Sequence, residues 1–164
     1  MSHPFFIKLQ GIKQGDFKGE VTDPNGLPAV QGVGFEQSIA SPRDAASGQA
    51  TGRRQYSPIV ITKEWGAASP QLFQALVNNE SLKTVQFDFY DSQPGAEGSR
   101  LWFTIKLSNA FVSKIEKYEH FNAAGHQDAN DDRFLEDISF TFQKIEMVHQ
   151  ASSTTTTDTA QAVG

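Results

Sequence analysis

The stretch Thr51–Leu76 reads TGRRQYSPIVITKEWGAASPQLFQAL, and it places a predicted strand directly before a predicted helix. We expect the strand over Tyr56–Trp65, because apolar and polar residues alternate there. One of its faces carries Ile59, Ile61, Lys63 and Trp65. Pro58 indicates an edge strand or the start of a strand, since proline cannot donate a ladder hydrogen bond. Taken alone, the charged side chains of this stretch are expected to be solvated; they are Arg53, Arg54, Lys63 and Glu64.

The helix predicted to follow begins at Ser69, whose hydroxyl suits an N-cap, and Pro70 suits the first helical position. Four residues recur at helical spacing and predict a narrow apolar stripe. They are Leu72, Phe73, Leu76 and Val77. Asn78 and Asn79 offer a stop, because asparagine tolerates the left-handed conformation. The sequence therefore predicts one short helix that docks on a sheet.

Alternating residues dominate the second half of the chain. Leu82–Tyr90 and Leu101–Leu107 both alternate, which predicts an antiparallel hairpin. Near the end, one parity holds Ile138, Phe140 and Phe142, whereas the other holds Ile145 and Met147. One inserted residue near Gln143 and Lys144 would turn both sets to the core, which predicts a β-bulge. Many strands with one helix predict an all-β barrel or a two-sheet sandwich.

Length and composition exclude several classes of protein. The 164 residues suit one domain, and the net charge of −5 with no block of Lys and Arg argues against nucleic acid. The absence of cysteine excludes disulfides and thiolate sites. We expect no signal peptide and no membrane insertion, because no long apolar run occurs. We assign residues 1–150 to one β-barrel domain and predict that the Ser/Thr-rich residues 151–164 form a disordered tail.

The order of these parts resembles the haemolysin-coregulated protein (Hcp) family, the tube subunits of bacterial type VI secretion systems. The similarity covers roughly residues 4–149. The matching residues in the central stretch are Gly52-Arg53, Tyr56-Ser57-Pro58, Ile61-Thr62-Lys63-Glu64, Ser69-Pro70-Gln71-Leu72 and Ala75. Others lie outside it: Phe6-Ile7-Lys8, Gly11, Lys18-Gly19-Glu20, Phe134-Leu135-Glu136, Ile138, Phe140 and Phe142. The resemblance implies a small antiparallel β-barrel with a short helix on its side, similar to phage tail-tube proteins.

The same resemblance implies a structural subunit without catalytic residues, cofactor or metal. Copies would form homohexameric rings that stack into a hollow tube. The tube would carry a VgrG-type spike protein, would meet a contractile sheath and baseplate, and could hold small effectors in its lumen. The subunit would be made in the cytoplasm and secreted by the type VI machine without a signal peptide.

A long polar loop, Ala40–Gly52, precedes the predicted strand and contains too little apolar surface to pack. The family resemblance implies that an extended loop in this region takes part in ring-to-ring stacking. The stacking residues that we predict are Pro42, Arg43, Asp44, Arg53 and Arg54. The double change Arg43→Glu with Arg54→Glu should leave hexameric rings that no longer form tubes.

The alternative to a tube subunit is a monomeric β-barrel that binds a small molecule or is a metal-dependent enzyme. The best candidate ligands are His120, His126, Asp128, Asp131 and Asp132. They lie in one polar segment, whereas the ligands of a barrel enzyme would project from strands. Read as a calcium loop, this segment carries Arg133 in place of the required glycine. A solvated turn is therefore the preferred interpretation of this segment.

Overall fold

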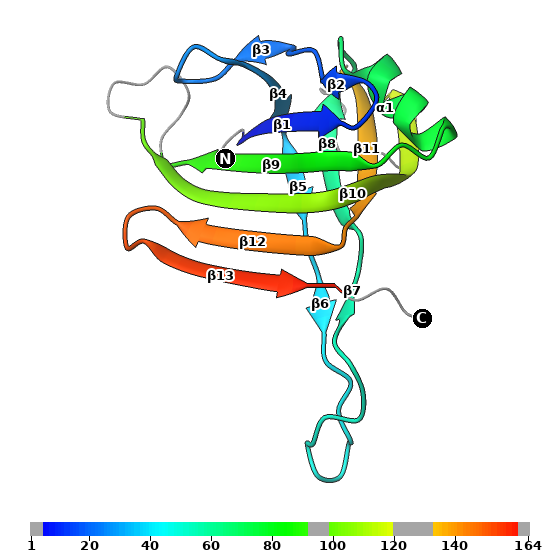
Figure 1. Cartoon of the computed structure of the whole chain (residues 1–164), viewed down its shortest axis with the longest axis vertical. Coiled ribbons are helices and arrows are strands. Elements are labelled where there is room, and N and C mark those ends of the chain that lie inside the picture. The colour runs from blue at the N-terminus through cyan, green and yellow to red at the C-terminus, as the bar shows by residue number, and fades with distance from the viewer. Residues whose placement is uncertain (1–4, 92–98, 120–132, 161–164) are drawn as a thin grey trace, which may run out of the picture.

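A computed structural model describes residues 5–91, 99–119 and 133–160, which form β-strands and one short helix (Figure 1). In chain order the elements are β1 (Phe5–Gly11), β2 (Gly15–Asp16), β3 (Val21–Thr22), β4 (Pro28–Gly32), β5 (Gly34–Glu36), β6 (Ile39–Ala40), β7 (Gln55–Tyr56), β8 (Ile59–Glu64), α1 (Ser69–Val77), β9 (Leu82–Tyr90), β10 (Leu101–Glu119), β11 (Phe134–Thr141), β12 (Lys144–His149) and β13 (Thr154–Thr159).

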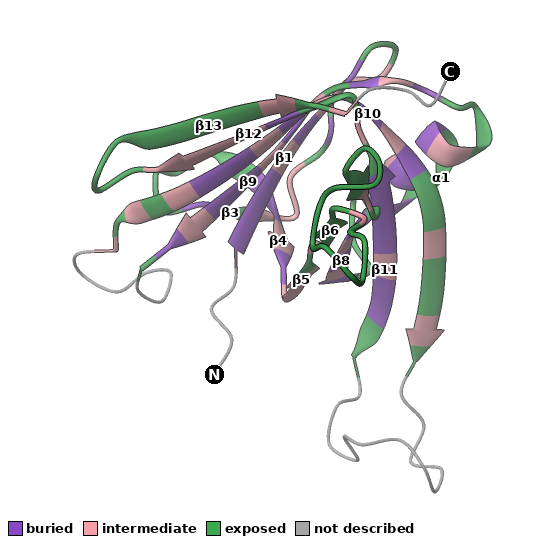
Figure 2. Cartoon of the chain, turned by 90° about the horizontal axis from the view of Figure 1, so that it is seen from below, coloured by how far each residue is buried: buried purple, intermediate pink, exposed green. Residues whose placement is uncertain are grey.

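Strand β10 belongs to two antiparallel sheets and connects them. Its first half lies between β9 and β12, and its second half pairs with β11. The β10–β11 register shifts between Val112 and Lys114, where the strand passes from one sheet to the other. An extra residue at such a position bends a strand and increases its twist. Figure 2 shows β9, β12 and β13 on one side of the molecule and β11 on the other.

A second connection between the sheets is the continuous segment Pro28–Glu36. Its first part, β4, pairs with β1, and its second part, β5, pairs with β8. Between them, the Val33 amide donates to the Thr62 carbonyl at 2.8 Å. The two sheets therefore surround a common core. The prediction of a mainly β, two-sheet antiparallel fold with one short helix is confirmed.

The core fills the space between the sheets with residues from every major strand. The fully buried side chains include Ile7, Ile59, Ile61, Phe87, Leu107, Ile138 and Phe140. Phe5 stacks on Phe89 with ring centroids 5.0 Å apart, and Phe35 meets Phe87 edge-on at 5.3 Å. Such aromatic pairs add favourable geometry to the area that they bury. Ile59 and Ile61 of β8 are buried on the face that the alternation groups together, whereas Trp65, predicted on the same face, is 44% exposed.

The predicted bulge near Gln143 and Lys144 is wrong, although both residue sets reach the core. Strand β11 ends at Thr141 and β12 begins at Lys144, and the two strands pair with different parts of β10. The chain turns from one sheet into the other instead of continuing through a bulge. This turn changes which parity faces inward, so that Ile145 is buried as Ile138 is.

The prediction of a disordered tail is contradicted over Thr154–Thr159, which form strand β13. This strand pairs with β12 along its whole length, from His149 opposite Thr154 to Lys144 opposite Thr159. A backbone ladder needs a free strand edge and not an apolar face, and threonine favours extended backbone. Low apolar content was therefore the wrong criterion for this segment.

Helix α1 has the predicted bounds but a different buried face. Leu72 and Ala75 are buried, whereas Phe73 and Val77 are 55% and 63% exposed. Asn79 has φ of 51°, which confirms the predicted left-handed stop. The predicted N-cap is wrong, since Ala68 occupies that position and no side chain caps the helix there. The Ser69 hydroxyl is engaged in a buried charge cluster described below.

Candidate functional site

The predicted stacking loop forms a hairpin that projects from the sheets, with β6 and β7 at its base (Figure 1). We call residues 38–57 the arm. From residue 38 to residue 55, every residue is exposed except Pro42, which is half-buried. The arm pairs with itself through Ile39 opposite Tyr56 and through a bridge between Arg43 and Ala50. It is a regular structural feature, and none of residues 38–55 is buried within its own chain.

The tip of the arm is a turn organised by Asp44. Its carboxylate accepts hydrogen bonds from the Ala46 amide at 2.9 Å and from the Ser47 hydroxyl at 3.2 Å. The Gly48 amide donates to the Asp44 carbonyl at 2.8 Å, and its φ of 72° suits glycine. The Ala46 amide and the Ser47 hydroxyl lower the pKa of Asp44. The tip therefore carries an ionised, internally bonded aspartate at neutral pH.

The structure divides the predicted stacking residues between the tip and the base of the arm. Pro42, Arg43 and Asp44 lie together near the tip, where the Thr51 amide donates to the Pro42 carbonyl at 2.9 Å. Arg53 and Arg54 lie on the returning segment of the arm, just before β7. The Arg54 guanidinium forms a two-pronged ion pair with Asp158 of β13, at 2.5 and 2.6 Å. This ion pair lowers the pKa of Asp158.

A buried cluster of charges lies at the far end of β8 from the arm. The Lys63 ammonium donates to Glu136 at 2.7 Å, to Glu20 at 2.9 Å and to the Glu64 carbonyl at 2.7 Å. The Ser69 hydroxyl donates to the same Glu136 oxygen at 2.6 Å. Lys63 and Glu136 are both 0% exposed, so the expectation that Lys63 is solvated is wrong. The sequence did contain a sign that Lys63 is buried, because Lys63 lies on the same face of β8 as the buried Ile59 and Ile61.

The surroundings of this cluster hold the helix entry against the sheet. A side chain on Gly66 would collide with the Glu20 carboxylate, since a Cβ there would lie 2.3 Å from it. Trp65 packs on Phe134 at 4.8 Å, and its indole donates to the Leu135 carbonyl at 2.7 Å. Lys117 lies 5.5 Å from the Trp65 ring centre. We assign these contacts to stability and not to chemistry.

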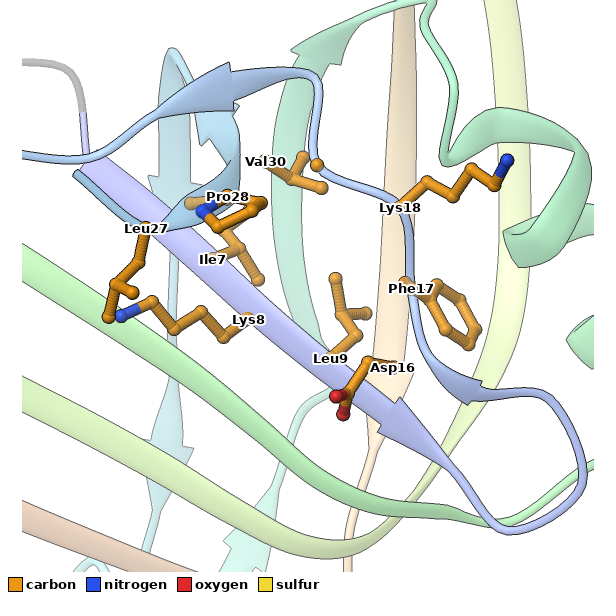
Figure 3. A pocket seen from close by; sticks show the side chains of 11 residues that line it. Ile7, Lys8, Leu9, Asp16, Phe17, Lys18, Leu27, Pro28 and Val30 are labelled. Atoms are coloured by element: carbon orange, nitrogen blue, oxygen red, sulfur yellow. The ribbon is translucent and has the colours of Figure 1, made fainter.

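A groove of about 580 Å³ opens beside β1, between residues 16–19 and residues 27–30 (Figure 3). Its walls are largely apolar, and its ionisable residues are Lys8, Asp16 and Lys18. Figure 3 shows the Lys8 and Lys18 side chains pointing in opposite directions. Lys8 is paired with Asp23 at 2.9 Å. These charges do not converge on one point, as the polar groups of a small-molecule site generally do.

The candidate metal ligands from His120 to Asp132 lie outside the described residues. Among the residues that the structure describes, no three histidine, cysteine, aspartate or glutamate side chains are grouped to hold a metal ion. Helix α1 is the one helix within the described residues, and it is too short to cross a membrane.

Comparison with known proteins identifies the family. Residues 6–149 match the family model described as "Type VI secretion system effector, Hcp". The chain belongs to the Hcp family. The major exported protein of Pseudomonas aeruginosa strain PAO1 is 33% identical over an alignment of 169 positions, which spans 96% of this chain and 95% of that protein. The family predicted from the ordered motifs is therefore confirmed.

Solved structures of Hcp proteins share the fold over nearly the whole chain. A crystal structure of an Hcp protein superposes with a TM-score of 0.84 at 25% identity, covering 97% of this chain and 100% of that one. The secreted Hcp3 protein of Pseudomonas aeruginosa gives 0.75 at 26% identity, with coverage of 98% and 100%. A mutant Hcp1 from E. coli EAEC 042 gives 0.81 at 25% identity, with coverage of 96% and 99%.

Proposed function

We propose that this Hcp protein is a structural, non-enzymatic subunit of the inner tube of a type VI secretion system. Copies form homohexameric rings, the rings stack into a hollow tube, and the tube is exported with a VgrG-type spike. The sheath and baseplate act on the tube from outside, and small effectors travel in its lumen. The subunit is synthesised in the cytoplasm and is exported by the type VI machine without a signal peptide.

The observation that carries the proposal is the exposed arm. Ordering a residue costs about 1–2 kcal/mol of backbone conformational entropy, and burial of apolar surface usually compensates for it. The arm compensates for little of this cost within its own chain, because almost all of residues 38–55 are exposed. Contact with another copy would bury this surface. Its regular tip turn around Asp44 then serves as a preformed contact.

The sheet edges support assembly into rings. Strands β13, β5 and β3 end the hydrogen-bonded paths among the described residues, so each has one side without a neighbouring strand. Unpaired strand edges are templates for pairing with another chain. A head-to-tail contact that closes on itself produces a ring. These edges are therefore candidate surfaces for contact between subunits.

We expect the purified protein to sediment as a hexamer, at six times the chain mass of 18.0 kDa. Analytical ultracentrifugation at micromolar concentration measures this directly, and native mass spectrometry counts the subunits. A single species of 18.0 kDa at these concentrations would refute the ring. Such a monomer would favour a binding protein or an enzyme instead.

We expect Arg43→Glu to leave hexameric rings intact while preventing their stacking. Arg43 is exposed near the tip, whereas Arg54 is engaged with Asp158, so Arg43 alone is a cleaner test than the double change. A ring repeats each contact around its circumference, and a small loss per subunit therefore becomes a large loss per interface.

Sedimentation separates rings from tubes, and negative-stain images show them. Arg43→Lys is the matched control, because it keeps the positive charge at the same position. If Arg43→Glu formed tubes as abundantly as the parent, the arm tip would not belong to the stacking surface.

A further inference from the structure

One carboxylate fastens the base of the arm to the last strand of the chain. Both oxygens of Asp158 accept from the Arg54 guanidinium, and Arg54 also donates to the Thr159 carbonyl at 3.0 Å. The Tyr56 hydroxyl donates to Asp158 as well. A two-pronged Arg–carboxylate pair fixes the relative orientation of its partners as well as their distance. We call Arg54, Tyr56 and Asp158 the clasp.

The clasp is supported from the barrel side. The Tyr56 ring packs edge-on against Phe142, with centroids 5.2 Å apart. Phe142 lies at the turn between β11 and β12, next to the core. Asp158 lies opposite Ile145 in the β12–β13 ladder, and Ile145 is buried. The carboxylate is therefore held on a strand that is itself paired to the core sheet.

Outside the clasp, the arm is held to the described sheets mainly through its narrow base. Its base has one pair of two-residue strands, and the residues beyond them, apart from the half-buried Pro42, are exposed up to the tip. A thin hairpin of this kind can swing about its base unless a tertiary contact fixes it. Among the arm contacts that the structure shows to the C-terminal strand, Asp158 is the common partner of Arg54 and Tyr56.

We propose that Asp158 is a positioning residue that sets the direction of the arm, so that its tip meets the next ring. The inference rests on the proposed tube function, and it gives β13 a role. The family match ends at residue 149, whereas β13 begins at Thr154. Solved Hcp structures nevertheless cover 97% and 98% of this chain, so the shared fold extends into β13, and this strand acts as a brace for the arm.

The absence of cysteine makes the direction of the arm measurable. Spin labels at Ala45→Cys on the tip and Lys83→Cys on β9 report one distance, and dilution with unlabelled chain removes distances between subunits. In the parent, electron–electron double resonance should show a narrow distance distribution. In Asp158→Ala the narrow distribution should be lost, because the tip samples many directions. Thr155→Ala, exposed on the same strand but outside the clasp, should keep it.

The exchanged pair Arg54→Asp with Asp158→Arg tests the ion pair itself. It should restore the narrow distribution and, with it, the tubes that Asp158→Ala loses while remaining a ring. Arg54→Gln removes the ion pair from the arm side of the clasp, and its distance distribution should be as broad as that of Asp158→Ala. The proposal would be overturned if the distance distribution of Asp158→Ala were as narrow as that of the parent. It would also be overturned if the distribution of the exchanged pair were as broad as that of Asp158→Ala. If the parent makes no rings, the tube function fails, yet the distance measurement still decides the clasp.

Discussion

Lys63→Met is expected to lower the free energy of unfolding by about 3–5 kcal/mol, because it leaves buried carboxylates without their counter-ion. Glu136 is 0% exposed, and its contact with Lys63 at 2.7 Å is the shortest ion pair of the cluster. The remaining cation, Lys117, lies 3.6 Å from the other Glu136 oxygen and is partly solvated. Urea titration followed by tryptophan fluorescence measures the change.

Two further variants separate lost charge from lost side chain. Lys83→Met removes an exposed lysine from β9 and should change stability by less than about 0.5 kcal/mol. Lys63→Met with Glu136→Leu removes both partners, and replacing a buried pair by apolar residues is often nearly neutral. We therefore expect the double variant to be more stable than Lys63→Met. Equal losses in Lys63→Met and Lys83→Met would show that the buried cluster contributes nothing.

The second large effect is expected from Leu72→Ala on α1, which should cost about 2–5 kcal/mol. Leu72 is 1% exposed and packs in the main core, so its truncation leaves a cavity. The adjacent Phe73 is larger but 55% exposed. Phe73→Ala should therefore change stability by less than about 0.5 kcal/mol, although it removes more atoms.

Chemical denaturation of the two helix variants gives a direct comparison. The sequence stripe predicts that both substitutions destabilise the protein, whereas the structure predicts that only Leu72→Ala does. Similar midpoints for Leu72→Ala and Phe73→Ala would mean that the helix docks through the stripe that the sequence predicted.

Of the candidate site, the location of the arm could be predicted, but the roles of its residues could not. The composition of Ala40–Gly52 excludes packing in the core, and that is a local property. The different roles of the arm residues depend on partners that can be distant in the sequence. Asp44 bonds within the tip turn, whereas Arg54 bonds a residue 104 positions away in the chain. No spacing near Arg54 indicates that partner.

Local sequence patterns were enough to predict the strands β8 and β9, the pairing of β9 with β10 and the limits of α1. These features depend on alternation and on residues such as Pro70 and Asn79, whose backbone preferences act within a few positions. Only the folded structure shows which carboxylates neutralise Lys63, which side of α1 is buried, and whether the threonine tail is ordered. Each depends on a partner distant in the chain. The free energy of a buried charge or an added strand is set by that partner, and local composition does not contain it.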